Sequence, residues 1–514
     1  MMIINYLKTA IRNFKKYKGY FFINVFGLSL GISACLLITL WIWDELRYDH
    51  HHEKADRIFR IGVHSVVQDN LSDLSTCSAP MAETLVREFP EVEAAGRIRR
   101  FGNQKISFGD QNFIEKRLLW CDNSLLNVFT IPILKGDREN PLAKPNTVII
   151  SEDMAAKYFG EMDPIGKTLI LGRNQHFKVT ALMKNTPRRS HVQYDFLASL
   201  ETIRDSRNKN YISNNYHTYF VLREGVSLSD FKEKLKSVVT KYLAPQVKQA
   251  LGVSLVDFYA SGGEFDFILQ PITDIHLGSN LRFELEPNGN IIYVYIFMIV
   301  AIAILLIACI NFVNLATARS MNRAREVGVR KAVGSSRRAL MVQFITETCL
   351  MSFFSILASL LMVELLLPLF NRFTGKILEI PYLTTPILLP LFLFLALVLG
   401  FLAGIYPALF LSSFRPVDVL KGRSLRKQGS LKVRNMLVLF QFTVSIILII
   451  GTLVVSKQMS YIQDKNLGFD RNQILLLPIN GDAFGKVWTL KKSLASIPGV
   501  HGASVLSNLM GDSY

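Results

Sequence analysis

Five apolar stretches divide the chain, and each is about as long as a helix must be to cross the hydrocarbon core of a membrane. One stretch lies near the amino terminus, three follow one another in the second half of the chain, and the fifth follows a short basic segment. Because only helices and closed barrels satisfy their backbone hydrogen bonds in lipid, the pattern predicts five transmembrane helices. They cover residues 20–43, 291–315, 344–369, 387–411 and 436–455.

A long polar segment, 44–290, separates the first two apolar stretches and is large enough to fold around its own core. It combines runs of β-branched and aromatic residues with short amphipathic helical patterns, which favours an α+β domain. Ser151 and Ser229 are expected helix N-caps, and Gly160 is an expected helix end. We expect strands at 58–67, 147–150, 177–183 and 218–222, and helices at 81–88, 152–159 and 230–242.

Charge is distributed unevenly among the polar segments. Residues 1–18 hold five basic residues and no acidic one, and loops 316–343 and 412–435 each hold seven basic residues and one acidic residue. Together these three segments account for the whole net charge of +17. By the positive-inside rule they lie in the cytoplasm. Because the basic excess follows the ends of membrane helices, it is not a nucleic-acid footprint. The segments outside are then 44–290, 370–386 and 456–514.

The predicted fold is therefore an α-helical transmembrane bundle, with five spans seen, that carries an α+β extracytoplasmic domain. The first apolar run continues past Cys35 and is too long for a signal peptide, so we interpret it as an uncleaved anchor rather than a lipoprotein cleavage site. Cys77 and Cys121 lie in the outside segment, where they either form a disulfide or stay free, because two cysteines do not define a disulfide framework.

The end of the chain repeats its beginning, which indicates a second module that starts and is incomplete at residue 514. The matching pairs are Arg12-Asn13 with Arg434-Asn435, 55–58 with 469–472, and 85–96 with 493–502. The expected parts are the amino terminus with the first helix (1–43), the outside domain (44–290), a membrane domain with three helices (291–425), the first helix of the second module (426–455), and an incomplete second outside domain (456–514). We expect this last part to be poorly ordered in isolation.

No residue pattern in the chain supports catalysis. Residues 160–168 resemble a phosphate-binding loop, but five residues separate the glycines where four are required, and no strand leads directly into them. A turn through Pro164 and Gly166 into a strand explains this segment better. No spacing suggests a nucleophile with its base, or a His-Glu-x-x-His site. We expect no catalytic residue and no cofactor.

Histidines follow the first span in the run Asp49-His50-His51-His52-Glu53, which contains metal-ligating residue types. Consecutive side chains point in different directions on any regular element, so a shared site would need ligands from elsewhere in the chain. Polar residues are also expected where a chain leaves the membrane. We therefore interpret the run as a polar segment and expect no metal.

The most distinctive polar segment is the basic loop after the second span. A short amphipathic helix is expected between Glu326 and Gly334, with Val327, Val329 and Val333 among basic side chains. Such a helix either docks onto a cytoplasmic partner or lies against anionic lipid. In the first span, residues 27–31 have the GxxxG spacing that lets helices pack closely, although glycine is common in membrane helices.

The stretch REVGVRKAVGSSRR at 325–338 resembles the signature of MacB/FtsX-like ABC transporter permeases. Further stretches agree with this family. They are ACINFVNL at 308–315, QFITE at 343–347, GIYPA at 404–408 and FRPVDVLKG at 414–422. Residues 158–167 resemble the MacB periplasmic core domain, and the resemblance extends over essentially the whole chain. In the family form with two modules per chain, eight spans are expected.

This resemblance implies a MacB-like periplasmic core domain at 44–290 and an FtsX-like permease domain at 291–425, in a multi-pass protein of the bacterial inner (plasma) membrane with a cytoplasmic amino terminus. It implies a permease subunit that couples a separate cytoplasmic ABC ATPase, by mechanotransmission, to movement of the periplasmic domain for efflux or export. The alternative is an FtsX-like regulatory protein that activates a cell-envelope hydrolase without transport.

The implied partners are the ATPase, membrane lipids, a periplasmic adaptor, an outer-membrane channel or lipoprotein, and a second module or copy in a pseudo-dimer or homodimer. Nucleic acid is not among them. Gly27 and Gly31 are expected in helix packing. The residues expected to couple the chain to the ATPase are Arg323, Glu326, Val327, Gly328, Arg330, Lys331, Gly334 and Arg337.

Overall fold

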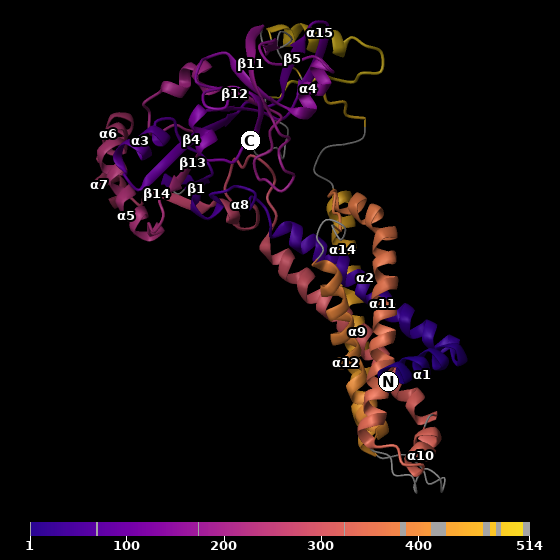
Figure 1. The fold of residues 1–514 in the computed structure, drawn as a ribbon. Helices are drawn as coiled ribbons and strands as arrows, with labels where there is room; N and C mark the ends of the chain where they lie inside the picture. Colours follow the sequence, from indigo (N-terminus) through magenta and orange to yellow (C-terminus); the bar gives the residue numbers. More distant parts are fainter. Residues whose placement is uncertain are drawn as a thin grey trace. The chain divides into compact units, whose positions relative to one another are not determined.

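The computed structural model describes residues 2–506 except 68–69, 173, 323, 381–386, 413–427, 466–472, 478 and 480–484. The chain divides into two compact units, whose elements are labelled in Figure 1. The first unit consists of Met1–Asp44 and Ile292–Gln473. The second unit consists of Glu45–Ile291 and Ile474–Tyr514.

The five predicted spans are all helices that are long and apolar enough to cross a membrane, so the predicted helical membrane bundle is confirmed. Four of these helices extend beyond their apolar stretches, because the end of an apolar run ends the contact with lipid but not the backbone hydrogen bonding of the helix. The fourth span has its predicted length, shifted by one residue. The helices are α2 (Lys18–Glu45), α9 (Ile291–Asn322), α11 (Arg337–Thr374), α12 (Leu388–Ser412) and α14 (Gln428–Asp464).

A further helix, α1 (Met2–Lys16), precedes the first span and was not predicted. Ala10 and Phe14 are buried on one side of it, where they belong to the same apolar core as Met351 of α11. Arg12 lies on the opposite side and is exposed. Because its apolar residues are spaced four apart and never form a continuous run, a search for apolar stretches does not find this helix.

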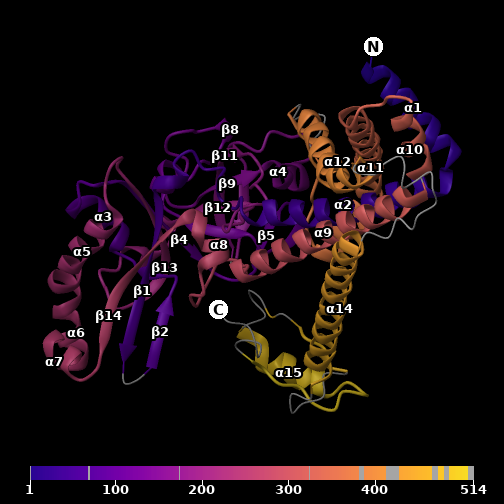
Figure 2. The same ribbon diagram turned by 90° about the horizontal axis from the view of Figure 1, so that it is seen from below.

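Glycines bring the membrane helices close together. A Cβ atom added at Gly400 of α12 would lie 2.4 Å from the Cα atom of Cys349, and one at Gly404 would lie 2.1 Å from the Thr348 hydroxyl oxygen. Figure 2 shows the two helices, α11 and α12, side by side. Between α2 and α9, a Cβ atom at Gly31 would lie 2.4 Å from the Cβ atom of Ala308. These approaches exclude any side chain larger than hydrogen at the three glycines without displacement of a neighbour.

In the second unit, the described strands form one mixed 14-stranded sheet, which confirms the predicted α+β class. The main path runs β14-β1-β13-β4-β7-β12-β9-β11-β10-β5-β6, while β2, β3 and β8 pair with β1, β13 and β11. Two pairs, β7 with β12 and β9 with β11, are parallel. The strands are β1 (Ile58–Val67), β2 (Asn70–Leu74), β3 (Cys77–Ser78), β4 (Val92–Arg100), β5 (Gln104–Phe108), β6 (Gln111–Glu115), β7 (Leu118–Cys121), β8 (Ile133–Gly136), β9 (Thr147–Ser151), β10 (Thr168–Leu171), β11 (Gln175–Met183), β12 (Phe196–Ser199), β13 (Asn214–Leu222) and β14 (Glu264–Pro271).

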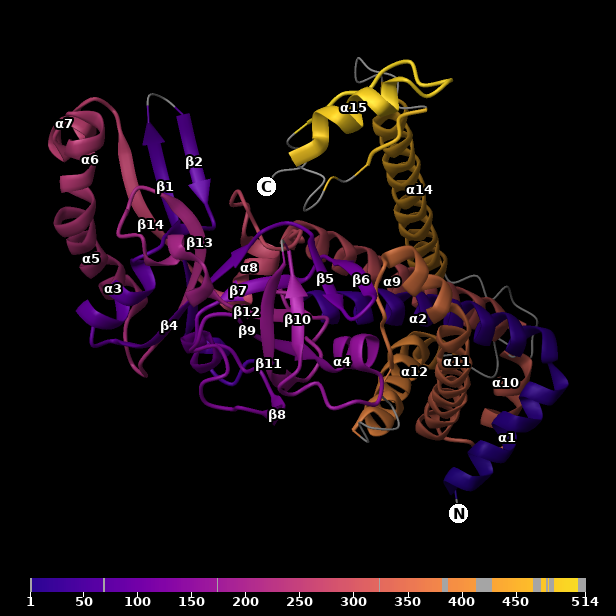
Figure 3. The same cartoon turned by 90° about the horizontal axis from the view of Figure 1, so that it is seen from above.

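Helices pack against the β14 end of the sheet path. Figure 3 shows α5 and α6 beside β14 and β1, and Phe231 of α5 packs with Leu85 of α3 and Phe220 of β13 in one core. The helices are α3 (Met81–Glu88), α4 (Glu152–Phe159), α5 (Leu228–Val238), α6 (Ala244–Leu251), α7 (Leu255–Ala260) and α8 (Ile272–Gly278). Shorter turns are η1 (Ala55–Arg57), η2 (Asn123–Asn127), η3 (Leu200–Thr202), η4 (Arg204–Arg207) and the π-helical η5 (Val239–Leu243).

The predicted helix ends are partly right. The Ser151 side chain accepts a hydrogen bond from an N–H group in the first turn of α4, and Gly160 follows that helix with φ +60°, as expected. The predicted cap at Ser229 is wrong, because Ser227 caps α5 and accepts the N–H of Asp230. Ser227 has extended backbone angles, which leave its hydroxyl free to face the first turn, whereas Ser229 already lies inside the helix.

The second unit also takes in the carboxy-terminal segment, where α15 covers Val487–Ala495. The apolar residues Ile474–Leu477, in which we expected strand residues without a sheet, are exposed and form no strand. The expectation that this segment is poorly ordered in isolation stays a prediction.

Candidate functional site

The basic loop after the second span contains α10 (Ala324–Ala332), which ends in a glycine turn. Gly334 has φ +100°, and its N–H donates to the carbonyl of Lys331 over 3.1 Å. The N–H of Ser335 donates to the carbonyl of Arg330 over 2.9 Å. This pair of bonds is a Schellman motif, which stops the helix at a fixed residue. The loop is therefore a discrete short helix and not an extended strand of basic residues.

One side of α10 packs against the membrane helices. Val327 is only 2% exposed and shares a small apolar core with Leu340 of α11 and Ala408 of α12. The guanidinium group of Arg330 donates to the Oε1 atom of Gln343 over 2.8 Å. An apolar contact and a side-chain hydrogen bond thus hold α10 against the ends of two long helices, α11 and α12.

Two exposed valines lie one turn apart on the other side, Val329 within α10 and Val333 directly after its last residue. Val329 is 51% exposed and Val333 is 84% exposed. Lys331 lies between them in sequence, and burial, with the charge of Arg337 as a smaller cause, lowers its pKa below the usual value. Two apolar side chains among cations form a surface that can bury apolar area against another protein.

The residues predicted to couple the chain to an ATPase lie in different environments. Val327 and Gly328 are buried, Arg330 and Lys331 are half-buried, and Gly334 and Arg337 are exposed. Arg323 lies outside the described residues, and the described part of Glu326 is its backbone in α10. The prediction did not include Val329 and Val333, although their four-residue spacing was a visible signal.

The predicted packing glycines Gly27 and Gly31 face α9. The Cβ position of Gly27 lies 3.5 Å from the Nδ2 atom of Asn311, a looser approach than that of Gly31. The prediction missed two glycines of α12: Gly400, whose contact is as close as that of Gly31, and Gly404, whose contact is closer. These two glycines have the same GxxxG spacing, so the same signal could have found them.

A polar cluster lies just after α2, in the second unit. The Asp49 carboxylate accepts hydrogen bonds from the hydroxyl of Ser190 (3.0 Å) and from the ring Nδ1 of His191 (2.8 Å), while the Nε2 atom of His191 lies 2.9 Å from the hydroxyl of Tyr219. Burial alone would raise the pKa of Asp49, but the charge of His191 and these hydrogen bonds lower it overall. These hydrogen bonds connect the backbone directly after α2 with the loop that precedes β12.

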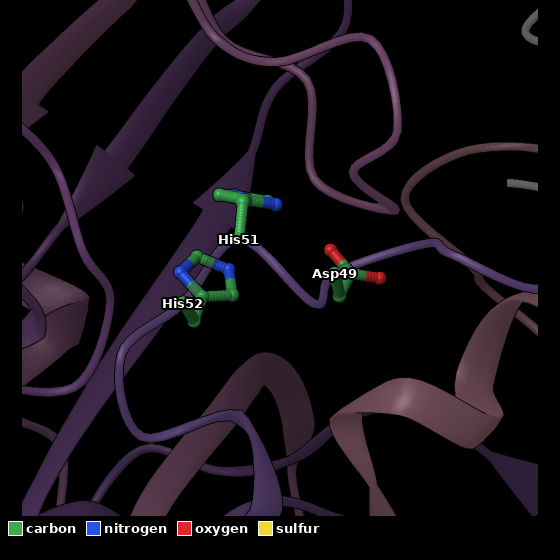
Figure 4. Close-up of side chains that lie close together, drawn as sticks. All are labelled: Asp49, His51 and His52. Atoms are coloured by element: carbon green, nitrogen blue, oxygen red, sulfur yellow. The ribbon is translucent and has the colours of Figure 1, made fainter. Parts of the chain in front are cut away.

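Asp49, His51 and His52 offer ligand atoms that all lie within 4.8 Å of one another (Figure 4). The expectation that consecutive residues would point apart is wrong here, because Asp49 has φ +60° and the chain turns. In the part of the chain described, the Nδ1 atom of His51 and the Nε2 atom of His52 have no hydrogen-bond partner. These three residues are therefore the donor set with which the chain could hold a metal ion.

The hydrogen bonds of His52 do not fit a metal ligand. Its Nδ1 atom accepts the backbone N–H of Thr130 over 3.1 Å, so the proton of the neutral ring lies on Nε2. Burial, with the neighbouring His51 as a smaller cause, lowers the pKa of His52 to about 3, so the ring stays neutral. The Asp49 carboxylate is already used by three donor groups. This arrangement favours a structural role for the run.

The other sequence motifs have simple structural explanations. Gly166 has φ +81° in the turn that leads into β10, as predicted for the segment that resembles a phosphate loop. Cys77 and Cys121 are both free and buried, and the thiol of Cys77 lies 3.1 Å from the Thr218 hydroxyl. The disulfide alternative is therefore wrong. Burial raises the pKa of Cys77 to about 12, so this thiol is unreactive.

Two family models match the chain. The MacB-like periplasmic core domain matches residues 21–238, and the FtsX-like permease C-terminal domain matches residues 298–416. No curated protein sequence matches the chain. The first match covers most of α2 and the sheet domain through α5, without β14, and the second covers α10, α11, α12 and most of α9.

Three solved structures are similar to parts of the chain. A domain of a Porphyromonas gingivalis protein described as a permease has 24% sequence identity and a TM-score of 0.38, and covers 43% of this chain and 92% of its own. The periplasmic region of MacB from Actinobacillus actinomycetemcomitans has 14% identity and a TM-score of 0.29, and covers 43% and 91%. The extracellular domain of the noncanonic ABC-type transporter YknZ from Gram-positive bacteria has 14% identity and a TM-score of 0.27, and covers 41% and 99%.

Five apolar helices, a large sheet domain between the first two, and the two matched domains define a membrane permease of the ABC transporter class. The chain belongs to the MacB/FtsX-like permeases. Membership in this family implies a multi-pass protein of the inner membrane with a periplasmic domain and an ABC ATPase as partner. The permease-family domains indicate a non-catalytic transmembrane subunit.

Proposed function

We propose that this chain couples a separate cytoplasmic ABC ATPase to movement of its own periplasmic domain, and that the movement drives efflux or export. The amino terminus and the loop that contains α10 would lie in the cytoplasm, on the side where ATP is available. The proposal needs no ATP-binding residue in the chain itself. It needs a surface for the ATPase and a rigid connection from that surface to the membrane helices.

The observation that carries the proposal is the two-sided character of α10. Val327 and Arg330 fix the helix to α11 and α12, while Val329 and Val333 point to solvent on the other side. An exposed apolar pair on a firmly packed helix could bind an ATPase that closes on ATP and displaces the helix. Lipid would cover the valines equally well, but it would supply no directed movement.

The periplasmic domain would then act on a further component. An adaptor, an outer-membrane channel or a lipoprotein are the proposed partners on that side, and a second module or copy would complete a pseudo-dimer or homodimer. The repeat that begins before α14 supports this arrangement, because residues 85–96 and 493–502 correspond in sequence.

The test is a substitution on the exposed side of α10. We expect Val333→Asp to abolish stimulation of the partner ATPase in reconstituted membranes, because a carboxylate would lie where apolar area is buried. Insertion and thermal stability of the chain should not change, since Val333 is exposed. Val256→Asp is the matched control, because Val256 is an equally accessible valine (75% exposed) on α7 of the periplasmic domain.

ATPase stimulation by Val333→Asp that equals the wild-type value would refute docking at α10. Val327→Asp is not a suitable probe, because it would place a charge in the core between α10, α11 and α12. A transport assay and a hydrolase assay distinguish the two roles. Activation of a cell-envelope hydrolase without any transport would show the regulatory function instead.

A further inference from the structure

The two chain segments that connect the periplasmic domain to the membrane meet at one buried side chain, His276. The ring Nε2 of His276 lies 2.7 Å from the Oε2 atom of Glu45, the last residue of α2. A carboxylate can only accept, so the imidazole donates this hydrogen bond. The backbone carbonyl of His276 accepts the N–H of Gly289 over 2.8 Å, two residues before α9 begins. One residue thus holds both segments.

The contacts around His276 are tight. Its ring stacks on Tyr48 with centroids 3.4 Å apart and planes inclined by 5°. A Cβ atom at Gly289 would lie 3.2 Å from both the Glu45 carboxylate and the His276 ring, so the position has little room for a side chain. Glu45 and His276 are each 7% exposed. A charge-assisted hydrogen bond shielded from water in this way is stronger than one at the surface.

His276 is itself anchored in the domain. It lies on α8, whose Ile272 and Ile275 are fully buried in a core with Tyr219 and Val221 of strand β13. A force on either segment therefore reaches the sheet through α8, and not only through the flexible backbone of a loop. Without this link, sliding of one segment past the other would be absorbed locally.

We infer that Glu45, His276 and Gly289 form a clamp that makes the two membrane connections of the periplasmic domain move as one. His276 is a positioning residue in this role, since it acts through the segments that it holds. The assignment of the clamp to energy coupling rests on the proposed function, whereas the mechanical linkage of the two segments stands on the contacts alone.

The linkage is tested by hydrogen–deuterium exchange on the full chain in lipid nanodiscs. His276→Ala should accelerate exchange in both 45–52 and 284–292, on the order of tenfold, since it removes a hydrogen bond to a charged group and a stacked ring. His276→Gln keeps an amide donor but not the ring, so it should give a smaller acceleration in both segments.

Gly289→Val is the sharper variant, because it perturbs the clamp from the opposite segment. It should accelerate exchange at 45–52, more than 230 residues away in sequence, because its side chain would press on Glu45 and His276. Gly278→Val is the matched control: Gly278 ends α8, yet a Cβ atom there has no neighbour within 4 Å among the described residues. If Gly289→Val accelerated exchange at 284–292 but not at 45–52, the clamp would be overturned.

The role in coupling is tested in membranes that also contain the partner ATPase. With His276→Ala, ATP hydrolysis should persist while the amount transported for each ATP falls, and His276→Gln should restore part of it. Unchanged transport for each ATP, with accelerated exchange in both segments, would overturn this role. If the wild-type chain shows no ATP-dependent transport, the proposed function fails instead, and the exchange result still decides whether the clamp exists.

Discussion

The closest helix approach in the membrane unit gives a quantitative prediction for Gly404→Ala. The added Cβ atom would lie 2.1 Å from the hydroxyl oxygen of Thr348, and 3.0 Å from its Cβ atom. The first distance is more than 1 Å shorter than an ordinary van der Waals contact of 3.4–4 Å. The Thr348 hydroxyl cannot move away freely, because it lies 2.9 Å from the carbonyl of Ile345 and 3.2 Å from that of Phe344.

Relief of this overlap requires either a new Thr348 rotamer, with loss of its hydrogen bond, or separation of α11 from α12. Overpacking of this kind costs about 1–3 kcal/mol. At about 2–4 °C for each kcal/mol in a unit of this size, we expect the melting temperature of the full chain in detergent to fall by roughly 4–8 °C for a cost near 2 kcal/mol. Removal of the obstructing hydroxyl with Thr348→Ala in the same chain should recover much of the loss.

Gly451→Ala is the matched control, because Gly451 also lies in a membrane helix but has no neighbour within 4 Å of its Cβ position in the described structure. It should melt at the wild-type temperature or up to about 4 °C above it, because alanine stabilises a helix interior by about 1 kcal/mol relative to glycine. A Gly404→Ala protein that melts like the Gly451→Ala protein would show that α11 and α12 do not pack as described. The same conclusion would follow if Thr348→Ala gave no recovery.

Two further predictions concern the periplasmic domain. Burial lowers the pKa of His52 and of His217 to about 3, with His51 and Arg60 as the next causes, so both rings stay neutral in the fold while the unfolded chain takes up protons below about pH 6.5. The free energy of unfolding should therefore fall as pH decreases through this range, by roughly 4 kcal/mol at pH 5 for the two rings. Urea unfolding at pH 7.5 and at pH 5 measures this loss, and the loss should be about half as large in His217→Phe. Arg60 is fully buried and donates to Glu284, so Arg60→Met should cost about 3–5 kcal/mol in thermal unfolding, whereas the double variant Arg60→Met/Glu284→Met should recover most of it; equal losses in both would contradict a paired role.

The pattern of apolar and polar residues determined the membrane helices of this chain, because the length of an apolar run is a local property. The orientation expected from the charge bias stays a prediction. Five apolar runs predicted α2, α9, α11, α12 and α14, and the helices occur where the runs do. Within the sheet domain, local signals also placed β1, β9 and β11 and the cap at Ser151. The helix α1 was not predicted, because its buried apolar residues form a stripe along one side and not a continuous run.

The family signature located α10, but only the tertiary structure decided which of its residues face inward. Val327 and Val329 are two residues apart with the same side chain, yet one is buried against α11 and α12 and the other is exposed. A short helix has apolar residues on more than one side, and only the neighbouring helices select the side that becomes core. The sequence therefore located the segment but could not decide which of its sides stays exposed.

The clamp shows the same limit over a longer distance. Nothing local to Glu45, His276 or Gly289 indicates that they meet, because 231 residues separate the first two along the chain. Their contact depends on how the sheet brings α8 back to the point where the chain leaves α2, and that is decided by long-range strand pairing, such as the antiparallel register of β1 with β14. Local propensity fixes elements, whereas the packing of distant elements fixes which polar side chains share a buried site.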